Sequence, residues 1–212
     1  MMEIAPRTVN IMSMIIATCT SDYCLFVADT RRTRNGEGDT IEIIDDNYHK
    51  IITVNNDIVF GWSGRFSNSE LDNHIHDHLI PSSADYVMAK EKIKEYCLKN
   101  SRYIYMIGAL RTYFIGGRDA NGFFNLFKYS YDPLDYCFRV EEACMKESTG
   151  ICTQIALPYS IGNTGKMYNH VVEDILATNN FNDGVAQVEQ IIRDVSVNDE
   201  TVNDKIDTII IR

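Results

Sequence analysis

Three charged residues follow one short apolar run in this sequence. Residues 25–28 are all apolar, as is typical of a buried strand, and Asp29, Arg31 and Arg32 follow. Burying an acid and two bases is costly unless they are paired, so one interpretation is a cleft in which they meet. The other is a solvated strand end at which Asp29 and Arg31 simply pair with each other. The residues alone leave both interpretations open.

Three histidines form a second cluster that could do chemistry, at positions 74, 76 and 78. On a helix His74 and His78 share one face, with Asp77 beside them, and this spacing can hold a metal ion. No glutamate lies between them as in an HExxH motif, and no third ligand is identifiable. A solvated helix face is the favoured interpretation, and we expect neither a metal nor another cofactor.

Cysteines invite a disulfide or metal interpretation. The sequence has six, at Cys19, Cys24, Cys97, Cys137, Cys144 and Cys152. None forms a CxxC pair or another close metal spacing, and the first ten residues lack the apolar core of a secretory signal. We therefore expect reduced cysteines in a cytoplasmic protein.

Size and charge narrow the class of protein. A chain of 212 residues can form one domain with a large core, and 45% hydrophobic with 24% charged residues is typical of a globular fold. The net charge of −10 argues against a nucleic-acid partner, which would require a basic face. No apolar run approaches the length of a membrane span, so no membrane partner is expected.

The hydrophobic pattern predicts strands and helices in a definite order. Strands are expected over residues 9–20, 23–28, 41–44, 50–54, 58–62, 112–117, 123–131, 151–161 and 208–211, and helices from 67 or 68 to 79, from 83 onward, over 166–177 and over 183–197. Strands that are apolar on both faces need cover on both sides. Two sheets packed face to face, each with an outer helical layer, meet that need and predict an α+β fold, a four-layer αββα sandwich.

Two stretches fit this plan less well. Residues 1–7 carry no periodic signal, and residues 1–12 are interpreted as an N-terminal extension or propeptide before a single domain over 13–212. Residues 132–150 are acidic and are expected to be irregular.

Five short segments stand in a recognisable order. They are Val27–Thr33 (VADTRRT), His49–Ile51 (HKI), Phe60–Gly64 (FGWSG), Phe114–Asp119 (FIGGRD) and Ser160–Gly165 (SIGNTG). Together with the element order, they resemble motifs of the proteasome β-subunit family and its simpler bacterial relatives, which are N-terminal-nucleophile hydrolases. The likeness covers most of residues 12–212 and departs from the family at 34–47 and 132–150.

The resemblance implies a catalytic centre. In the family the nucleophile is the first residue of the mature chain, sixteen residues before the motif aspartate, and counting back from Asp29 gives Ser13. Its free α-amino group, with a pKa of about 8, would act as the base. Lys50 would place positive charge beside the nucleophile, Asp29 would anchor Lys50, and the Gly64 N–H would form the oxyanion hole.

Further site residues follow from the same resemblance. Asp199 matches the family's second aspartate, although Val202 stands where a serine is common. Substrate contacts are implied for Arg31, Thr33, Trp62 and Asn163. Trp62 would line the pocket for the residue before the scissile bond and favour small side chains there, with a core tryptophan as the competing interpretation.

The nucleophile departs from the family pattern. Serine replaces the usual threonine at position 13, and Met12 replaces the glycine that precedes a self-cleaved nucleophile. A plain strand serine beneath the extension is the alternative for Ser13. Thr8 as nucleophile would need a longer hairpin. Cys19 would suggest the cysteine branch of the N-terminal-nucleophile amidases, but the arginine spacing does not follow and a core cysteine is favoured.

Two functions from different classes follow. The first is a peptidase or amidase assembled as a homo-oligomeric ring, acting on peptide or protein substrates, with an ATPase as a possible partner. The alternative is a catalytically inactive, ring-forming member whose role is assembly or binding.

Overall fold

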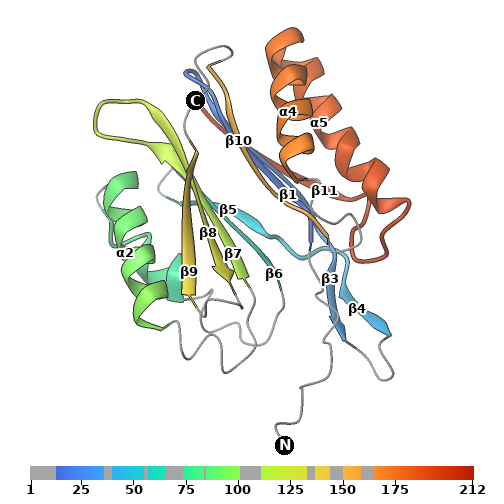
Figure 1. The fold of residues 1–212 in the computed structure, drawn as a ribbon, viewed down its shortest axis with the longest axis horizontal. Coiled ribbons are helices and arrows are strands. Elements are labelled where there is room, and N and C mark those ends of the chain that lie inside the picture. The colour runs from blue at the N-terminus through green and yellow to red at the C-terminus, as the bar shows by residue number, and fades with distance from the viewer. Residues whose placement is uncertain are drawn as a thin grey trace, which may run out of the picture.

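Two antiparallel β-sheets lie face to face at the centre of the molecule (Figure 1). The computed structural model describes residues 13–35, 40–54, 57–64, 74–83, 85–100, 111–132, 137–143, 150–158 and 165–212. The first sheet has the order β10 (Cys152–Ala156), β1 (Ile15–Cys19), β2 (Cys24–Asp29), β11 (Ile206–Ile211). The second has the order β5 (Ile51–Val54), β6 (Ile58–Gly64), β7 (Arg111–Arg118), β8 (Phe124–Asp132), β9 (Cys137–Ala143).

Helices cover the outer face of each sheet, as Figure 1 shows. Helices α4 (Gly165–Thr178) and α5 (Phe181–Ser196) lie over the first sheet, and helix α2 (Tyr86–Lys99) with the π-helical turn η2 (Ile75–Leu79) lies over the second. Three apolar cores separate the four layers, one between the sheets and one beneath each helical layer. The predicted α+β, four-layer αββα sandwich is therefore confirmed.

Strand alternation produces this layering. In β1 the side chains of Ile15, Ala17 and Cys19 enter the core between the sheets, while Ile16 enters the core beneath α4 and α5. Successive side chains of a strand point to opposite faces, so an all-apolar strand supplies both cores at once. For this reason the apolar residues of such strands follow one another in the sequence and do not alternate with polar ones.

Short polar residues set the helix starts. The Asp85 carboxylate accepts a hydrogen bond from the Met88 N–H, and the Asn180 side chain accepts one from the Asp183 N–H. Each satisfies a backbone donor that the first helical turn leaves open. Among the helices described, none is both long and apolar enough to cross a membrane.

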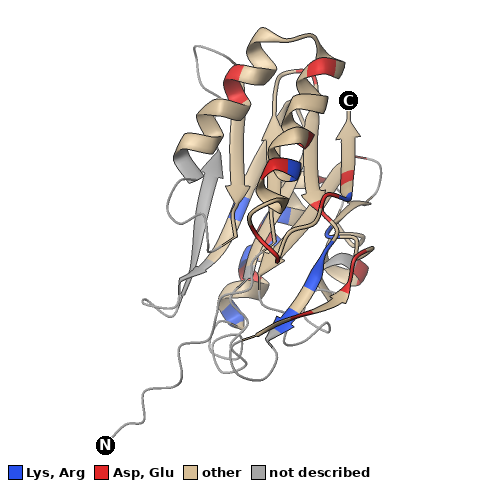
Figure 2. Cartoon of the chain, turned by 90° about the vertical axis from the view of Figure 1, so that its right-hand side faces the viewer, with Lys and Arg blue, Asp and Glu red and all other residues tan. Residues whose placement is uncertain are grey.

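A short ribbon of two strands projects from the sandwich. The strand predicted over 41–44 is its second strand, and the first was not predicted. Strand β3 (Arg32–Asn35) pairs with β4 (Ile41–Asp45), and basic residues on the first face acidic residues on the second (Figure 2). The pattern gives no strand over residues 32–35, because a charged segment has no apolar face to mark it. Backbone pairing with β4 forms the ribbon, and Arg34 and Glu42 face each other across it at 2.6 Å.

The expectation that residues 132–150 are irregular was also wrong in part. Strand β9 occupies 137–143 and pairs with β8 at the edge of the second sheet. Its sequence, CFRVEEA, mixes apolar and charged residues too closely for a clear period of two. An edge strand depends on the neighbouring backbone for its hydrogen bonds, so weak patterning can suffice.

Candidate active site

A buried ion pair joins the two sheets at the end of β2. The Lys50 Nζ lies 2.6 Å from the Asp29 Oδ2, and the side chains are 4% and 0% exposed. Asp29 ends a strand of the first sheet, whereas Lys50 directly precedes β5 of the second. The two chain segments are therefore fixed to each other by opposite charges shielded from water.

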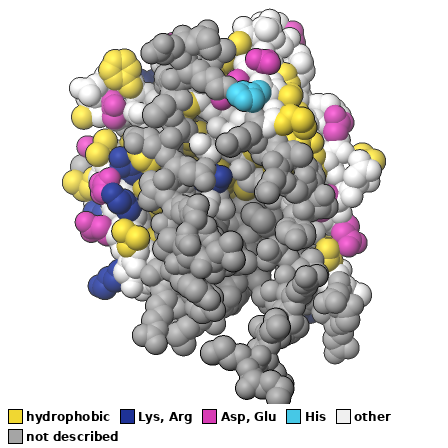
Figure 3. Space-filling view, in the orientation of Figure 1, with side chains coloured by type: hydrophobic (Ala, Val, Ile, Leu, Met, Phe, Trp, Pro, Cys, Tyr) yellow, Lys and Arg dark blue, Asp and Glu magenta, His cyan; other side chains and the backbone are white. Residues whose placement is uncertain are grey.

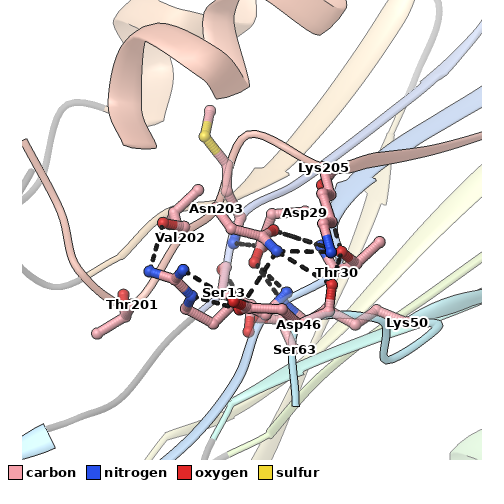
Figure 4. A network of polar contacts seen from close by, with 12 residues as sticks. Ser13, Asp29, Thr30, Asp46, Lys50, Ser63, Thr201, Val202, Asn203 and Lys205 are labelled. Atoms are coloured by element: carbon pink, nitrogen blue, oxygen red, sulfur yellow. Dashed lines mark hydrogen bonds and ion pairs between the residues drawn. The ribbon is translucent and has the colours of Figure 1, made fainter. Parts of the chain in front are cut away.

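Ser13 lies against this pair through its backbone. The Met14 N–H donates to the Asp29 Oδ1 at 2.8 Å, and the Ser63 hydroxyl donates to the Ser13 carbonyl at 3.0 Å. Figure 4 shows Ser13, Asp29, Lys50 and Ser63 gathered in this one network. Lys50 does not point into bulk solvent, and Ser13 itself is half-buried. The site thus places the Ser13 backbone and the Ser63 hydroxyl beside a buried carboxylate and ammonium group.

Burial shifts the pKa of both members of the ion pair. It raises the pKa of Asp29, an effect opposed by Lys50 and by the N–H groups of Met14 and Arg31. It lowers the pKa of Lys50, an effect opposed by the Asp29 carboxylate. Each charge would be costly alone and is tolerated because the other is beside it. A buried ammonium group held in this way can stabilise negative charge that develops on a neighbouring oxygen.

Arg31 belongs to a separate ion pair. Its Nε lies 2.6 Å from the Asp46 Oδ1 and its Nη2 3.2 Å from the Asp46 Oδ2, a bidentate arrangement. The Nη1 also donates to the carbonyl oxygen of Glu200 at 3.0 Å. The interpretation in which Asp29 and Arg31 pair their side chains is therefore wrong, because each has another partner. The Arg31 backbone N–H, however, donates to the Asp29 Oδ2 at 3.0 Å.

A side-chain network fixes the loop between α5 and β11 to the same strand end. The Asn203 Oδ1 accepts from the Thr30 N–H at 3.0 Å, and the Asn203 Nδ2 donates to the Asp46 carbonyl at 3.2 Å. The Thr30 hydroxyl donates to the same carbonyl at 2.7 Å. Asn203 and Thr30 are buried, so these bonds replace those that water would make.

Two predicted residues of strand β6 occupy different surroundings. Gly64 has φ of 120°, a conformation that favours glycine and leaves its backbone open to close approach. Trp62 is buried beneath η2 and α2, stacked on Phe60 with 5.5 Å between ring centroids. Ser63, the residue between them, instead contacts Ser13. The roles of Gly64 in an oxyanion hole and of Trp62 in a pocket stay predictions, although the packing of Trp62 is that of a core residue.

The remaining predicted residues lie nearby or outside the described chain. Asp199 is buried and accepts bonds from the N–H and the hydroxyl of Thr201, at 2.8 and 2.5 Å. A hydroxyl thus lies beside Asp199, from residue 201 and not from position 202. Thr33 is buried in β3, and Asn163 lies outside the described residues. Catalytic or substrate roles for all three stay predictions.

The alternative nucleophiles and metal ligands gain no support. Thr8 lies outside the described residues, and Cys19 is buried at the opposite end of β1 from Met14. The His74 and His78 rings lie 5.4 Å apart, and the position of the His76 side chain is not described. In the part of the chain that the structure describes, no three His, Cys, Asp or Glu side chains are grouped to hold a metal ion.

Several residues of this site were missed in the sequence. Ser63 lies within a recognised motif, FGWSG, in which the resemblance implies roles only for Trp62 and Gly64. Asp46 and Asn203 stand in polar stretches that look like solvated loops. The sequence gives one indication of them, which is that the Arg31 guanidinium requires an acidic partner. It does not show which residue that partner is.

Comparison with solved structures identifies the architecture. Eukaryotic HslV from Trypanosoma brucei matches with a TM-score of 0.55 at 12% identity, over 93% of this chain and 98% of that chain. Anbu, described as an ancestral beta-subunit, from Yersinia bercovieri matches with a TM-score of 0.60 at 15% identity, over 93% of this chain and 81% of that one. The fold is the proteasome-like N-terminal-nucleophile fold.

A second Anbu structure agrees with this assignment. The Gly-1 mutant of Anbu from Hyphomicrobium sp. strain MC1 matches with a TM-score of 0.60 at 14% identity, over 93% of this chain. No protein-family model and no curated protein matches the sequence. At these identities the similarity establishes the fold, and the chemistry must be argued from the site.

Proposed function

We propose that the chain is a proteasome-like peptidase or amidase of the simpler bacterial type, with Ser13 as its N-terminal nucleophile. The observation that carries the proposal is the buried Asp29–Lys50 pair beside the Ser13 backbone. A fully desolvated acid–base pair contributes little to stability, so its presence at a strand end favours a functional role.

Each residue has one role in the proposed reaction. The Ser13 hydroxyl attacks the substrate carbonyl, and the free Ser13 amine accepts its proton. Lys50 stabilises the negative charge on the Ser13 oxygen, while Asp29 holds Lys50 in place and accepts the Met14 N–H. The Gly64 N–H donates to the oxyanion of the tetrahedral intermediate, a contact typically worth about 10²–10³ in rate. The substrate C–N bond then breaks, and the Ser13 ammonium gives its proton to the leaving amine. Water hydrolyses the resulting acyl ester, which restores the Ser13 hydroxyl and releases the acid.

Assembly into a homo-oligomeric ring is part of the proposal. Helix α2 exposes Val87, Met88 and Leu98, and α4 exposes Met167 and Val171. In the view of Figure 3, apolar side chains stand in small groups among acidic ones rather than singly. Contacts between subunits would cover such groups. Light scattering that gives a concentration-independent mass near 24.2 kDa would contradict the ring.

The experiment compares two lengths of the chain. A version beginning at Met12, whose methionine is removed to expose the Ser13 amine, is expected to hydrolyse small peptide amides. The full chain is expected to be much weaker, because an acylated nitrogen cannot act as a base. Ser13→Ala should lower the rate of the short version at least about a thousandfold, whereas Ser21→Ala, in the exposed turn of the same hairpin, should not.

A second candidate is a catalytically inactive ring-forming protein. The twelve residues before Ser13, with Met12 in place of the glycine of self-cleaved relatives, favour this alternative. Mass spectrometry of the native N-terminus distinguishes the two. An N-terminus at Ser13 supports the peptidase, while an intact extension together with equal, unmeasurable activity of both lengths supports the inactive protein.

A further inference from the structure

Three cysteines lie side by side across the first sheet, away from the candidate active site. Cys19 of β1 is paired in register with Cys24 of β2 on one side and with Cys152 of β10 on the other. All three side chains enter the core between the sheets. Cys97, by contrast, belongs to α2 and is buried in the core between that helix and the second sheet.

The hydrogen-bond pattern of the hairpin shows which pair is more closely opposed. The Thr20 N–H donates to the Tyr23 carbonyl and the Asp29 N–H to the Met14 carbonyl, which makes both of these hydrogen-bonded pairs. Such pairs alternate along antiparallel strands, so Cys19 and Cys24, next to Thr20 and Tyr23, form a non-hydrogen-bonded pair. Side chains are closer in this kind of pair, with Cα atoms about 4.5 Å apart.

Cys152 is less well placed for a bond to Cys19. Because the Cys19 backbone groups do not bond to β2, they face β10, and Cys19 with Cys152 forms a hydrogen-bonded pair. The Cys19 and Cys152 thiols also interact, but in this kind of pair the Cα atoms are about 5.5 Å apart and the side chains are farther apart than in a non-hydrogen-bonded pair. Cys24 is also only five residues from Cys19 along the chain, so closing that loop costs little entropy.

We propose that Cys19 and Cys24 are the site of an intramolecular cross-strand disulfide, formed when the protein meets a peroxide or a disulfide oxidant. Their sulfur atoms are already in contact. Both thiols lose their protons, one sulfur–sulfur bond forms, and the two electrons released reduce hydrogen peroxide to two water molecules. Cys152 stays a thiol. The oxidant gains access when the hairpin end, with its exposed turn at Ser21 and Asp22, opens locally.

The position of this pair gives the bond a structural consequence. Cys19 and Cys24 close the β1–β2 hairpin at its turn, and Met14 and Asp29 lie paired at the open end of the same two strands. A covalent link at the turn fixes the register of the whole hairpin, because slipping by one residue would break the bond. The inference is independent of whether Ser13 is catalytic.

Peptide mapping tests the proposal on the full chain. The folded protein is treated with hydrogen peroxide or oxidised glutathione for hours, its remaining thiols are alkylated, and it is digested with trypsin without reduction. No lysine or arginine lies between positions 8 and 30, so both cysteines fall in the single peptide 8–31. The expected product is this peptide, lighter by two hydrogens, about 2 Da, with neither cysteine alkylated. Cleavage after Tyr23 should then leave its two halves linked.

Two variants sharpen the result. Cys24→Ser is expected to lose the oxidised peptide, and Cys97→Ser, which alters a buried cysteine elsewhere, is expected to retain it in full. Because the mapping of the unaltered chain needs no variant, poor folding of Cys24→Ser does not affect the test. Linkage of peptide 8–31 to the peptide that contains Cys152, or prolonged oxidation with both cysteines still alkylated, would overturn the proposal.

Discussion

Two ion pairs meet at the end of β2, and they differ in almost every physical respect. Asp29–Lys50 is sealed from water, with side chains 0% and 4% exposed, whereas Arg31–Asp46 is 19% and 35% exposed. Burial raises the pKa of Asp29 and lowers that of Lys50, so water exclusion works against both charges. Hydrogen bonding raises the pKa of Arg31 and lowers that of Asp46, so that contact favours both charges.

Under the proposed function, the contrast separates a catalytic pair from a structural one. A pair that costs free energy to bury is retained for what its charges do, while a solvated bidentate pair can simply hold two segments together. Arg31 does the latter, because its guanidinium binds Asp46 and the carbonyl of Glu200 at once. Mutations at the two pairs should therefore have different consequences.

Removing Lys50 is expected to have the largest effect. Lys50→Met leaves the Asp29 carboxylate buried without its counter-ion and should lower the free energy of unfolding by about 3–5 kcal/mol, measured by urea denaturation. The double variant Asp29→Asn with Lys50→Met should recover part of that loss, because no charge then remains buried. Lys205→Met, at an exposed lysine of the neighbouring loop, serves as control and should cost less than about 0.5 kcal/mol. A loss for Lys50→Met no larger than that for Lys205→Met would show that leaving Asp29 without its counter-ion costs little, and would contradict the prediction.

Replacing Arg31 should have an intermediate effect. Arg31→Lys keeps the charge but loses the bidentate contact with Asp46 and the bond to the Glu200 carbonyl, and should cost about 1–2 kcal/mol after allowance for solvent screening. Arg34→Lys is the matched control, because its pair with Glu42 is exposed on both sides and should contribute nothing measurable. Thermal unfolding measures the loss of stability in the two variants. A loss for Arg31→Lys no larger than that for Arg34→Lys would show that contacts other than those of Arg31 hold the loop between α5 and β11 in place.

The smallest expected effect is on acid stability. Arg31 first, and Lys205 after it, hold the pKa of Asp46 below its ordinary value of 3.8. Asp46 therefore binds a proton more readily in the unfolded chain than in the folded protein. The ionised Asp46 stabilises the fold fully at pH values above 3.8, and this stabilisation is lost as the pH falls through the lower pKa of the folded protein. Asp46→Asn should make the unfolding free energy less dependent on pH below about 4. An unchanged slope in the variant would mean that Asp46 is not the group responsible.

The Asp29–Lys50 contact was predictable, but only through a family resemblance. The spacing from Ser13 to Asp29 and the HKI motif indicated that the two charges meet. Asp46 and Asn203 could not be found in the same way. They act through side chains that reach Arg31 and Thr30 from segments 15 and 173 residues away, and no local pattern records such pairings.

The sequence by itself determined the layers, and the tertiary structure decided the partners. Apolar residues at strand and helix spacing define which faces must be buried, because burial of apolar surface is a property of each segment alone. The four layers follow from that requirement. Charges and cysteines are different, since what Arg31, Asp46, Cys19 and Cys24 do depends on which side chain lies opposite across a strand or a loop. That choice is made when the sheets pack and the register is fixed, so only the folded chain reveals it.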